Sequence, residues 1–470
     1  MKFIKQSTQG ILTDGKLSCC YQDISNLLTK LSDYFSQQGI NPKDCLVLEC
    51  ENSVPAAVVL LFLLEYDYSF LLSKAENKTQ TFPKFCRYQL EIDANSLEPE
   101  SFLTINKLPV QTTEKINKIP SIYLRTSGST GEPKIIAHSH LKLLGNIEKC
   151  VERLGFDAQT RMALPVPISH LFGLGAGFLP AVFVGASVDL QKGANIIRYL
   201  QREKTFNPNT VLMTPIFCET LLKGRKIARA YRLTVVAGDC LRNQTFTDYE
   251  ALFGCLVQLY GSTEMGAIAA GNPKDSARLR ADFIGLPMDD VQIKIDKITA
   301  EINDADKNTG ELHCLREYGF EACLNHQGEQ VNLPQINSEG WFATKDLGKI
   351  STEGYIKVLG RCDNSVKRDG LLVLFADIEI ALQTIKGISA VAVVAYGESL
   401  RGKKIWAYCV AEDEGLNAVE IRSQCFDILP RRAIPDKVMI IESLPLLGNG
   451  KINRLSLLKT SKKLIESKIE

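Results

Sequence analysis

Three apolar runs in the middle of the chain restrict its possible folds more than any other feature. They are "TVLMTP" (210–215), "LTVVAGDC" (233–240) and "CLVQLYGSTE" (255–264), and each ends in small or polar residues. Segments with helical periodicity separate them, and this alternation predicts an open, largely parallel sheet covered by helices. In such a sheet ligands bind at the carboxyl ends of the strands. We therefore expect an α/β protein whose ligand site lies beside these strand ends.

The N-terminal hundred residues show the same α/β pattern. A helix is predicted within 21–40, because apolar residues recur there at helical spacing before Gly39: Ile24, Leu27, Leu28, Leu31 and Phe35. The run "DCLVLECENS" (44–53) suits a buried parallel strand. The most apolar run, "VPAAVVLLFLLEY" (54–66), is shorter than the roughly 20 residues that cross a bilayer, so a buried helix is predicted. No export signal is visible, and we expect a cytoplasmic protein without a membrane span.

The last third of the chain changes in character twice. Residues 291–315 alternate apolar and polar side chains, with Asp, Asn and Gly in the turns, which predicts an antiparallel β subdomain. After Arg361 come strands, a helix, two more strands, a helix and a final strand, typical of a compact α+β domain of about 110 residues. We therefore expect a large N-terminal domain over 1–361 and a small mobile domain over 362–470. The basic tail after Leu455 is predicted to be a solvated helix end.

Composition excludes several classes of partner and site. The chain has 55 basic and 54 acidic residues and a net charge of +1, so it carries no electrostatic signature of nucleic-acid binding or of an acidic membrane surface. The 14 cysteines include no CxxC pair and no Cys/His cluster with metal-ligand spacing. Reduced thiols in a cytosolic protein are expected.

The segment "YLRTSGSTGEPKIIAHSH" (123–140) carries the first chemical signal. Its glycines allow close backbone approach, and its hydroxyl and N–H groups can surround a polyanion. A triphosphate or pyrophosphate is therefore the expected ligand. The segment is not a Walker loop, because Gly131 is followed by Glu132 and Pro133 before Lys134.

The string "TSGSTGEPK" resembles the signature loop of the adenylate-forming superfamily, which includes acyl- and aryl-CoA synthetases, peptide-synthetase adenylation domains and luciferases. The resemblance covers most of the chain, since the other motifs of that superfamily follow in the expected order. It assigns the ATP phosphates to the residues of this loop: Thr126, Ser127, Gly128, Ser129, Thr130, Gly131 and Lys134.

The string "QLYGSTEMG" (258–266) looks like the second nucleotide motif of the superfamily. By resemblance Tyr260 flanks the adenine, Thr263 contacts the α-phosphate and Glu264 holds Mg²⁺. A carboxylate beside small donors also suits a hard cation that bridges phosphates. The resemblance adds further ATP-binding residues in this motif and in "AGDCL": Gly238, Asp239, Gly261 and Ser262.

Two longer motifs complete the resemblance. In "GWFATKDLGKISTEGYIKVLGRCDNSVKRDG" (340–370), Asp346 would bind both ribose hydroxyls, Arg361 would lie near the ribose and phosphates, and Asp363 would be the interdomain hinge. In "LPLLGNGKINR" (444–454), Lys451 occupies the position of the catalytic lysine that reaches the α-phosphate and the carboxylate. Gly370 would let the backbone lie close to the pantetheine arm in the thiol channel.

The implied reaction uses ATP and Mg²⁺ to convert a carboxylate to an acyl-adenylate with release of pyrophosphate. Two anions must approach each other, so the step needs charge neutralisation by Mg²⁺, Lys451 and the donors of the loop. A thiol of CoA or of a carrier-protein phosphopantetheine then opens the mixed anhydride. Such a thiol scarcely requires a general base.

The segment "PVPISHLFGLGAGFLPAVFVGAS" (165–187) corresponds to the flank of the acid pocket. His170 takes the position of a gating histidine or aromatic residue, and Gly261 and Ala267 complete the expected acid site. Amino-acid activators place an aspartate in this segment, whereas no acidic residue lies between Asp157 and Asp189 here. An aryl or aliphatic acid is therefore the expected substrate.

Departures from the pattern leave the acceptor and some alternatives open. "FADIE" (375–379) places Phe375 and Asp377 where the superfamily has other residues, so CoA and a carrier protein both remain possible acceptors. An amino-acid-activating enzyme, a luciferase-like monooxygenase and a non-catalytic relative are the alternatives. A monomer or a dimer is expected.

Overall fold

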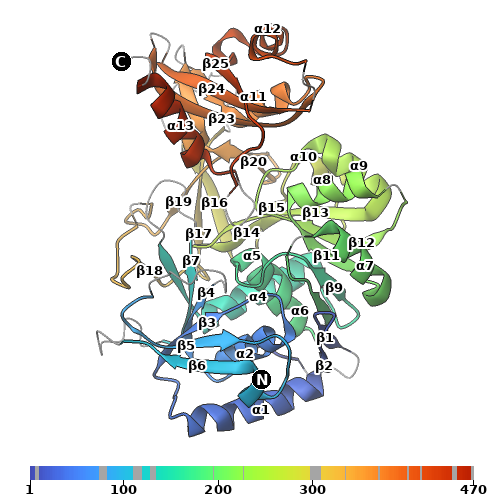
Figure 1. Cartoon of the computed structure of the whole chain (residues 1–470), viewed down its shortest axis with the longest axis vertical. Helices are drawn as coiled ribbons and strands as arrows, with labels where there is room; N and C mark the ends of the chain where they lie inside the picture. Colours follow the sequence, from blue (N-terminus) through green and yellow to red (C-terminus); the bar gives the residue numbers. More distant parts are fainter. Residues whose placement is uncertain are drawn as a thin grey trace.

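The computed structural model describes residues 1–5, 10–73, 82–109, 119–126, 134–193, 195–225, 227–296, 309–333, 335–368, 371–399, 402–412, 415–446 and 452–466. The strands of these residues form four sheets. Figure 1 shows the most C-terminal sheet and its helices at one end of the long axis, with the two largest sheets at the other.

The largest sheet has nine strands and a parallel centre with antiparallel edges. It is ordered β15 (Leu286–Pro287), β14 (Gly266–Ala270), β13 (Gly254–Ser262), β12 (Tyr231–Val236), β11 (Thr210–Met213), β9 (Arg161–Leu164), β10 (Ser187–Leu190), β1 (Ile11–Thr13) and β2 (Ser18–Cys20). The three runs that predicted a parallel sheet are β11, β12 and β13, which are adjacent and parallel. That prediction is confirmed.

The second sheet has seven strands and also has a parallel centre. Its order is β18 (Ala322–Leu324), β8 (Ile135–Ser139), β7 (Ser121–Arg125), β4 (Ser69–Ser73), β3 (Cys45–Glu49), β5 (Cys86–Ile92) and β6 (Leu103–Lys107). The predicted strand at 44–53 is β3. The hairpin β7–β8 carries the loop that was expected to bind phosphates.

Helices cover both large sheets, and the largest hydrophobic cluster lies among them, with separate smaller clusters on each sheet. The helices of this part are α1 (Tyr21–Gln37), α2 (Val54–Glu65), α3 (Pro99–Phe102), α4 (His140–Leu154), α5 (Leu171–Gly173), a π-helical turn (Leu174–Phe178), α6 (Leu179–Phe183), α7 (Ile196–Phe206), α8 (Pro215–Gly224), α9 (Asn243–Phe253) and α10 (Ala277–Asp282). Helix α2 is buried over eleven of its twelve residues, as its all-round apolar sequence predicted. No helix among the described residues is long and apolar enough to cross a membrane.

Local sequence explains why α4 begins directly after the phosphate-loop hairpin. Ser139 ends strand β8, and its hydroxyl accepts a hydrogen bond from the Lys142 N–H at 3.3 Å, which caps the new helix. The helix ends at Gly155, whose φ of 67° is the left-handed conformation that glycine adopts without strain. The strand therefore passes into α4 without a connecting loop.

The third sheet is antiparallel and is the β subdomain predicted from residues 291–315. It is ordered β16 (Val291–Asp296), β17 (Thr309–Arg316), β19 (Phe342–Ile350) and β20 (Ile356–Arg361). Strand β20 leads into the fourth sheet through a short 3₁₀ turn (Cys362–Asn364).

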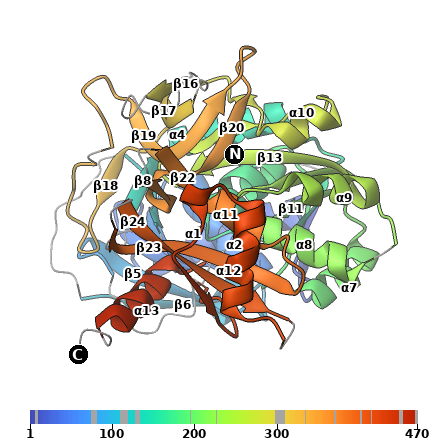
Figure 2. The same ribbon diagram turned by 90° about the horizontal axis from the view of Figure 1, so that it is seen from above.

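The fourth sheet contains only residues beyond that turn. Strands β22 (Leu371–Leu374), β21 (Ser365–Arg368), β24 (Gly402–Ala411) and β23 (Ile388–Ser399) form it in this order, and β25 (Lys437–Ile440) pairs with β24. Helices α11 (Phe375–Leu382), α12 (Ala418–Ile428) and α13 (Arg454–Glu466) and a 3₁₀ turn (Arg431–Ala433) accompany it. Figure 2 shows α11 and α12 together and α13 beside β23.

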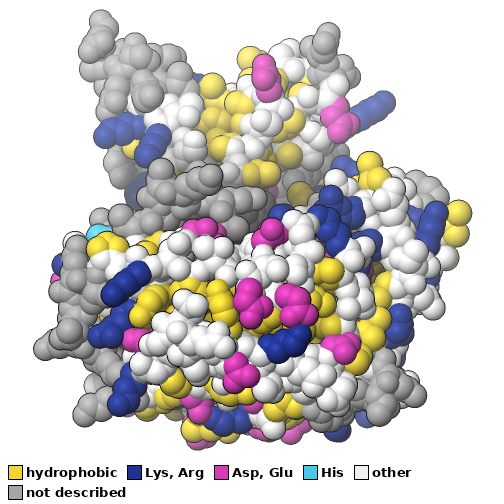
Figure 3. Space-filling view, turned by 60° about the horizontal axis from the view of Figure 1, so that its bottom comes forward, with side chains coloured by type: hydrophobic (Ala, Val, Ile, Leu, Met, Phe, Trp, Pro, Cys, Tyr) yellow, Lys and Arg dark blue, Asp and Glu magenta, His cyan; other side chains and the backbone are white. Residues whose placement is uncertain are grey.

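One expectation for this part was wrong. The tail after Leu455 is not a solvated helix end, because Leu457 and Ser461 of α13 are buried and the Tyr408 hydroxyl lies 2.7 Å from the Ser461 hydroxyl. The tail packs because Leu457 and Leu458 join a hydrophobic cluster with Ala392 and Val394 of β23 and Trp406 and Tyr408 of β24. In Figure 3 basic and acidic side chains are interspersed over the face shown, in keeping with the net charge of +1.

Candidate nucleotide and acid site

The predicted phosphate loop is closed at its base by strands β7 and β8. Thr126 donates its N–H to the Lys134 carbonyl at 2.8 Å, and the Lys134 N–H returns to the Thr126 hydroxyl at 3.3 Å. The loop residues Ser127, Gly128, Ser129, Thr130 and Gly131 lie outside the described residues, and their phosphate contacts stay predictions.

The second nucleotide motif forms the tight turn between β13 and β14. A Cβ on Gly261 would lie 2.2 Å from the Gly266 carbonyl oxygen, so only glycine fits where the two strands pair. The Ser262 hydroxyl accepts the Met265 N–H at 3.1 Å. The side chains of Thr263 and Glu264 on this turn are half-buried.

Three residues from distant motifs meet beside this turn. The Tyr260 hydroxyl donates to the Asp346 carboxylate at 2.6 Å, and the Arg361 guanidinium lies 3.2 Å from the other carboxylate oxygen. Burial, followed by the neighbouring Asp346 charge, raises the pKa of Tyr260 well above its usual value, so the phenol stays neutral and donates. The predicted adenine and ribose residues are thus in direct contact.

The backbone that leads to Asp346 is fixed by the neighbouring strand β17. The Thr344 hydroxyl donates to the Leu312 carbonyl at 2.7 Å and accepts the Asp346 N–H at 3.1 Å. Between them, Lys345 has a φ of 60° and donates its N–H to the Glu311 carboxylate at 2.9 Å. This irregularity lies within β19, an inner strand of the sheet, and the Asp346 next to it pairs with Arg361 at the end of β20.

The residues expected to frame the adenine follow β12. Gly238 has a φ of 104°, a conformation that other residues rarely adopt, and a Cβ there would meet no atom within 4 Å. The Asp239 carboxylate accepts the Cys240 N–H at 2.8 Å and is exposed. The strand end thus leaves open space at the carboxyl edge of the sheet.

A histidine joins the phosphate-loop hairpin to the Glu264 turn. His138 lies on β8, four residues after Lys134, and its Nε2 is 2.6 Å from the Thr263 carbonyl oxygen. The Cys323 thiol, on the adjacent strand β18, gives further evidence that this hairpin and the Glu264 turn lie close together. Burial raises its pKa, and the charges of Lys134 and Glu264 act on it in opposite directions, so both lie nearby.

Helix α4 contacts both the segment that follows His170 and the strand that carries Ala267. Asn146 donates to the Gly175 carbonyl in the π-helical turn at 2.9 Å and accepts the Ala267 N–H of β14 at 3.0 Å. His170 immediately precedes α5 and is half-buried, and Ala267 is buried. Asn146 therefore links the segment after His170 to the strand after Glu264.

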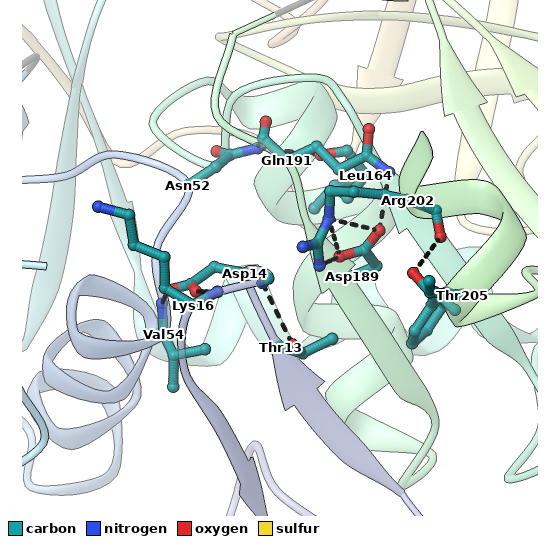
Figure 4. A network of polar contacts seen from close by, with 12 residues as sticks. Thr13, Asp14, Lys16, Asn52, Val54, Leu164, Asp189, Gln191, Arg202 and Thr205 are labelled. Carbon is teal, nitrogen blue, oxygen red and sulfur yellow. Dashed lines mark hydrogen bonds and ion pairs between the residues drawn. The ribbon is translucent and has the colours of Figure 1, made fainter. Parts of the chain in front are cut away.

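The segment that leads to His170 is held by Asn52, which Figure 4 shows beside Leu164 and Gln191. The buried Asn52 amide donates to the carbonyls of Leu164, Val166 and Gln191 at 2.9–3.0 Å. Its oxygen accepts the Ile168 N–H at 2.9 Å. Because Asn52 lies between β3 and α2, this single side chain ties the second sheet to the first.

Asp189 is the nearest acidic residue after this segment, and it is already engaged. It is fully buried, and it accepts hydrogen bonds from the Arg202 Nε at 2.9 Å and the Gln191 amide at 2.7 Å (Figure 4). The Asp189 carboxylate is therefore already paired with a guanidinium.

The remaining predicted residues belong to the C-terminal part. Asp363 lies in the 3₁₀ turn after β20, 3.6 Å from the Arg361 guanidinium. Lys451 and Gly370 lie outside the described residues, so the predicted catalytic lysine and thiol channel stay predictions.

Comparison with known proteins decides the family. The family model described as "AMP-binding enzyme" matches residues 73–319, and that of its C-terminal domain matches residues 377–451. The chain belongs to the adenylate-forming superfamily. The resemblance seen in the motifs is thereby confirmed.

Individual relatives are distant in sequence and similar in fold. The 2,3-dihydroxybenzoate-AMP ligase of Bacillus subtilis is 22% identical, over 95% of this chain and 89% of its own length. ATP-bound MatB from Rhodopseudomonas palustris has a TM-score of 0.82 at 18% identity, with 98% of both chains covered. The o-succinylbenzoate Coenzyme A synthetase (MenE) of Bacillus subtilis, in complex with ATP and magnesium ion, has a TM-score of 0.79 at 18% identity, with 96% and 97% covered. These structures confirm the predicted fold class.

The metal-binding side chains that the candidate site offers are those expected for Mg²⁺ bound together with phosphates. Among the described residues no cluster of three or more His, Cys, Asp or Glu could hold a metal by itself. Glu264 offers one half-buried carboxylate, for which no hydrogen bond or ion pair occurs within the part of the chain that is described. Mg²⁺ commonly binds through one or two carboxylates plus substrate phosphates, so this donor set fits the ion.

Sequence reasoning missed three residues that organise the site: His138, Asn146 and Arg316. His138 and Asn146 each contact a residue more than a hundred positions away along the chain, and Arg316 contacts one about fifty positions away. His138 stands in the segment 123–140 that carried the first chemical signal, after the recognised string, but nothing in the alternation of β8 shows which carbonyl it meets. Only the folded arrangement reveals these contacts.

Proposed function

We propose that this chain uses ATP and Mg²⁺ to convert a carboxylic acid to an acyl-adenylate and pyrophosphate. It then passes the acyl group to the thiol of CoA or of a carrier-protein phosphopantetheine, as an AMP-forming acid–thiol ligase. The observation that carries the proposal is the contact chain Tyr260–Asp346–Arg361, which joins two nucleotide motifs 86 residues apart. The named ligase, the ATP-bound neighbour and the ATP- and magnesium-bound synthetase support it.

The site residues have complementary roles in the first step. Asp346 accepts the ribose hydroxyls, Tyr260 lies along the adenine, and Thr263 donates to the α-phosphate. Glu264 would hold Mg²⁺, which supplies positive charge to the phosphates when it is bound. A carboxylate oxygen of the acid attacks the α-phosphorus, and the bond to the leaving pyrophosphate breaks. Arg361 and the loop donors offset the negative charge that the two anions bring together.

The acid is proposed to be aryl or aliphatic and not an α-amino acid. The segment after His170 is apolar and largely buried. Asp189 is committed to Arg202, so no free carboxylate between Asp157 and Asp189 is available for an ammonium group. A buried ammonium without such a partner carries a desolvation cost of several kcal/mol.

The second step is proposed to use the division near Arg361. Residues 1–361 would form the large domain, and 362–470 a small domain that rotates about Asp363. In one orientation Lys451 would reach the α-phosphate, and in the other the loop with Gly370 would line the path of the thiol. Lys451 and the loop with Gly370 cannot occupy the same space, so the two half-reactions require two orientations of the small domain.

A pyrophosphate-exchange screen tests the proposal. Benzoates, short and long aliphatic acids and amino acids are offered with ATP and Mg²⁺. Mass spectrometry of reactions with CoA and with holo carrier protein then identifies the acceptor. Exchange with simple acids but not with their α-amino analogues is expected. Exchange only with amino acids overturns the acid class, and no exchange with any acid overturns the function. Oxygen consumption or light on addition of acid and ATP identifies a monooxygenase.

A further inference from the structure

The turn that carries Thr263 and Glu264 is held by its backbone. Three successive carbonyl oxygens each accept a hydrogen bond, one from strand β8 and two from the segment 316–320. The Thr263 carbonyl is bound by His138 at 2.6 Å, the Glu264 carbonyl by the Phe320 N–H at 2.9 Å, and the Met265 carbonyl by Arg316 at 2.6 Å. The protein thus fixes the backbone oxygens, and the side chains of Thr263 and Glu264 are left to meet a ligand.

The Arg316 contact fixes the end of the turn nearest the acid segment. Its guanidinium is fully buried, pairs with Asp290 at 2.6 Å and donates to the Asn146 oxygen at 3.0 Å. A Cβ on Gly266 would lie 2.6 Å from that oxygen and 2.7 Å from the guanidinium. Only glycine fits where the turn meets this cluster. The close packing of the cluster therefore holds that end of the turn in one position.

The His138 contact fixes the end nearest the phosphate loop. His138 is 3% exposed and pairs across the hairpin with Ile122 on β7, close behind the Thr126–Lys134 closure. A carbonyl accepts, so the neutral ring must carry its proton on Nε2. Burial lowers the pKa of His138 to about 4, which keeps this neutral form at physiological pH.

We propose that His138 is a positioning residue that sets the place of Thr263 and Glu264 relative to the phosphate loop. It touches no substrate atom. It donates one hydrogen bond from the second sheet to the turn after β13 of the first sheet. It thereby links the two motifs that must bind the same triphosphate and its Mg²⁺. The proposal rests on the proposed function, because it assumes that Glu264 holds Mg²⁺ and Thr263 the α-phosphate.

The chain offers matched variants for the test. His138→Gln places an amide N–H near the position of Nε2 and retains the donor. His138→Leu keeps the bulk but leaves the Thr263 carbonyl unsatisfied. His140→Gln is the control, because His140 is also buried, two residues along, but faces Asp67, Phe3 and Phe70 and not the turn.

The measurement is pyrophosphate exchange as a function of acid, ATP and Mg²⁺ concentration, with a melting curve on each preparation. For His138→Leu we expect the maximal rate to fall about tenfold or more, and half-saturation by Mg²⁺ to need about tenfold more ion. The KM of the acid should stay unchanged. His138→Gln should recover most of the rate and of the Mg²⁺ response, and His140→Gln should match the wild type in both.

The outcomes separate the inference from the function. Exchange by the wild type together with a normal Mg²⁺ response in His138→Leu overturns the inference alone. A His138→Gln variant as defective as His138→Leu also overturns it. So does a His138→Leu variant in which the KM of the acid rises as much as the Mg²⁺ concentration needed for half-saturation. No exchange by the wild type with any acid overturns the proposed function instead. If His138→Leu does not fold, His138→Asn, whose amide is one methylene shorter than that of Gln, takes its place under the same criteria.

Discussion

The two carboxylates of the proposed nucleotide site are held in opposite ways. At the Glu264 turn the backbone is bound by other segments, while the Glu264 side chain has no hydrogen bond or ion pair among the residues described. On strand β19 the Asp346 side chain itself is bound, by Tyr260 and Arg361. Among the described residues, the Glu264 carboxylate thus has no protein partner and stands on a fixed backbone. The Asp346 carboxylate already accepts hydrogen bonds from the protein.

The difference indicates what each carboxylate must give up when a ligand binds. Glu264 loses only water, because no described protein group competes for its oxygens. Asp346 must share its oxygens between protein donors and ribose hydroxyls. A change at Glu264 should therefore affect chemistry without affecting stability, whereas a change at Asp346 should affect both.

The largest expected effect is that of Glu264→Gln. Removal of the charge should lower pyrophosphate exchange by about 10²–10³-fold, since the ion opposite the phosphates loses its protein ligand. The melting temperature should stay within about 1 °C of the wild type, because the backbone bonds of the turn remain. Exchange rates and melting curves on one preparation check both points. A large fall in melting temperature would contradict the idea of an open carboxylate.

Acid should weaken the support behind Glu264. Burial lowers the pKa of His138 to about 4, with Arg316, Lys142 and Glu321 as the nearest charges, and the pKa of the unfolded residue is near 6.5. The unfolded chain binds the proton more readily, so stability is full above pH 6.5 and is lost as the pH falls toward 4. Urea unfolding at pH 7.5 and 5 should show a loss of about 2 kcal/mol from this residue.

His138→Gln separates that contribution from the rest. The variant cannot be protonated at this site, so its pH dependence should be smaller by about 2 kcal/mol over the same interval. His140, whose pKa burial also lowers to about 4, adds a similar loss in both proteins. An unchanged pH dependence in His138→Gln would show that the buried imidazole is not the acid-sensitive group.

Asp346→Asn should have a mixed and smaller effect. The amide oxygen can still accept from Tyr260, but the charge opposite Arg361 is lost. We expect the KM of ATP to rise about tenfold, with little change in the KM of the acid. Because Arg361 is 39% exposed, the loss of stability should stay below about 1 kcal/mol. A variant with normal ATP binding would break the assignment of Asp346 to the ribose.

The sequence predicted the fold well because its strongest signals are local. The apolar runs of β11, β12 and β13, the period of α1 and the alternation of β16 each lie within one element, so periodicity identifies them. The motifs also indicated which residues belong to the nucleotide site, although motif membership does not test the role of any of them. The resemblance, and not the periodicity, gave the family.

The supports of the site could not be predicted, because their partners are far apart in the chain. Asn52 meets carbonyls more than a hundred residues away, and Arg316 meets Asn146 across 170 residues. Such contacts leave no periodic signal in either segment. The packed tail was misjudged for a related reason, since Ser461 gains its burial from Tyr408 on another element.

The smallest expected effect concerns how the two regions provide a left-handed residue. The Glu264 turn uses Gly266, with a φ of 67°, whereas strand β19 uses Lys345, next to Asp346, with a φ of 60°. A side chain in this conformation costs roughly 1–2 kcal/mol, while glycine avoids the strain and adds some entropy to the unfolded chain. Lys345→Gly should therefore raise the free energy of unfolding by about 0.5 kcal/mol, and Lys345→Ala, which keeps the strain, should not. Urea unfolding of both variants compares them directly, and exchange should stay within about twofold of the wild type because the Asp346 N–H remains bound to Thr344. If Lys345→Gly proves less stable than Lys345→Ala, the left-handed backbone beside Asp346 stores no strain that the Glu264 turn avoids.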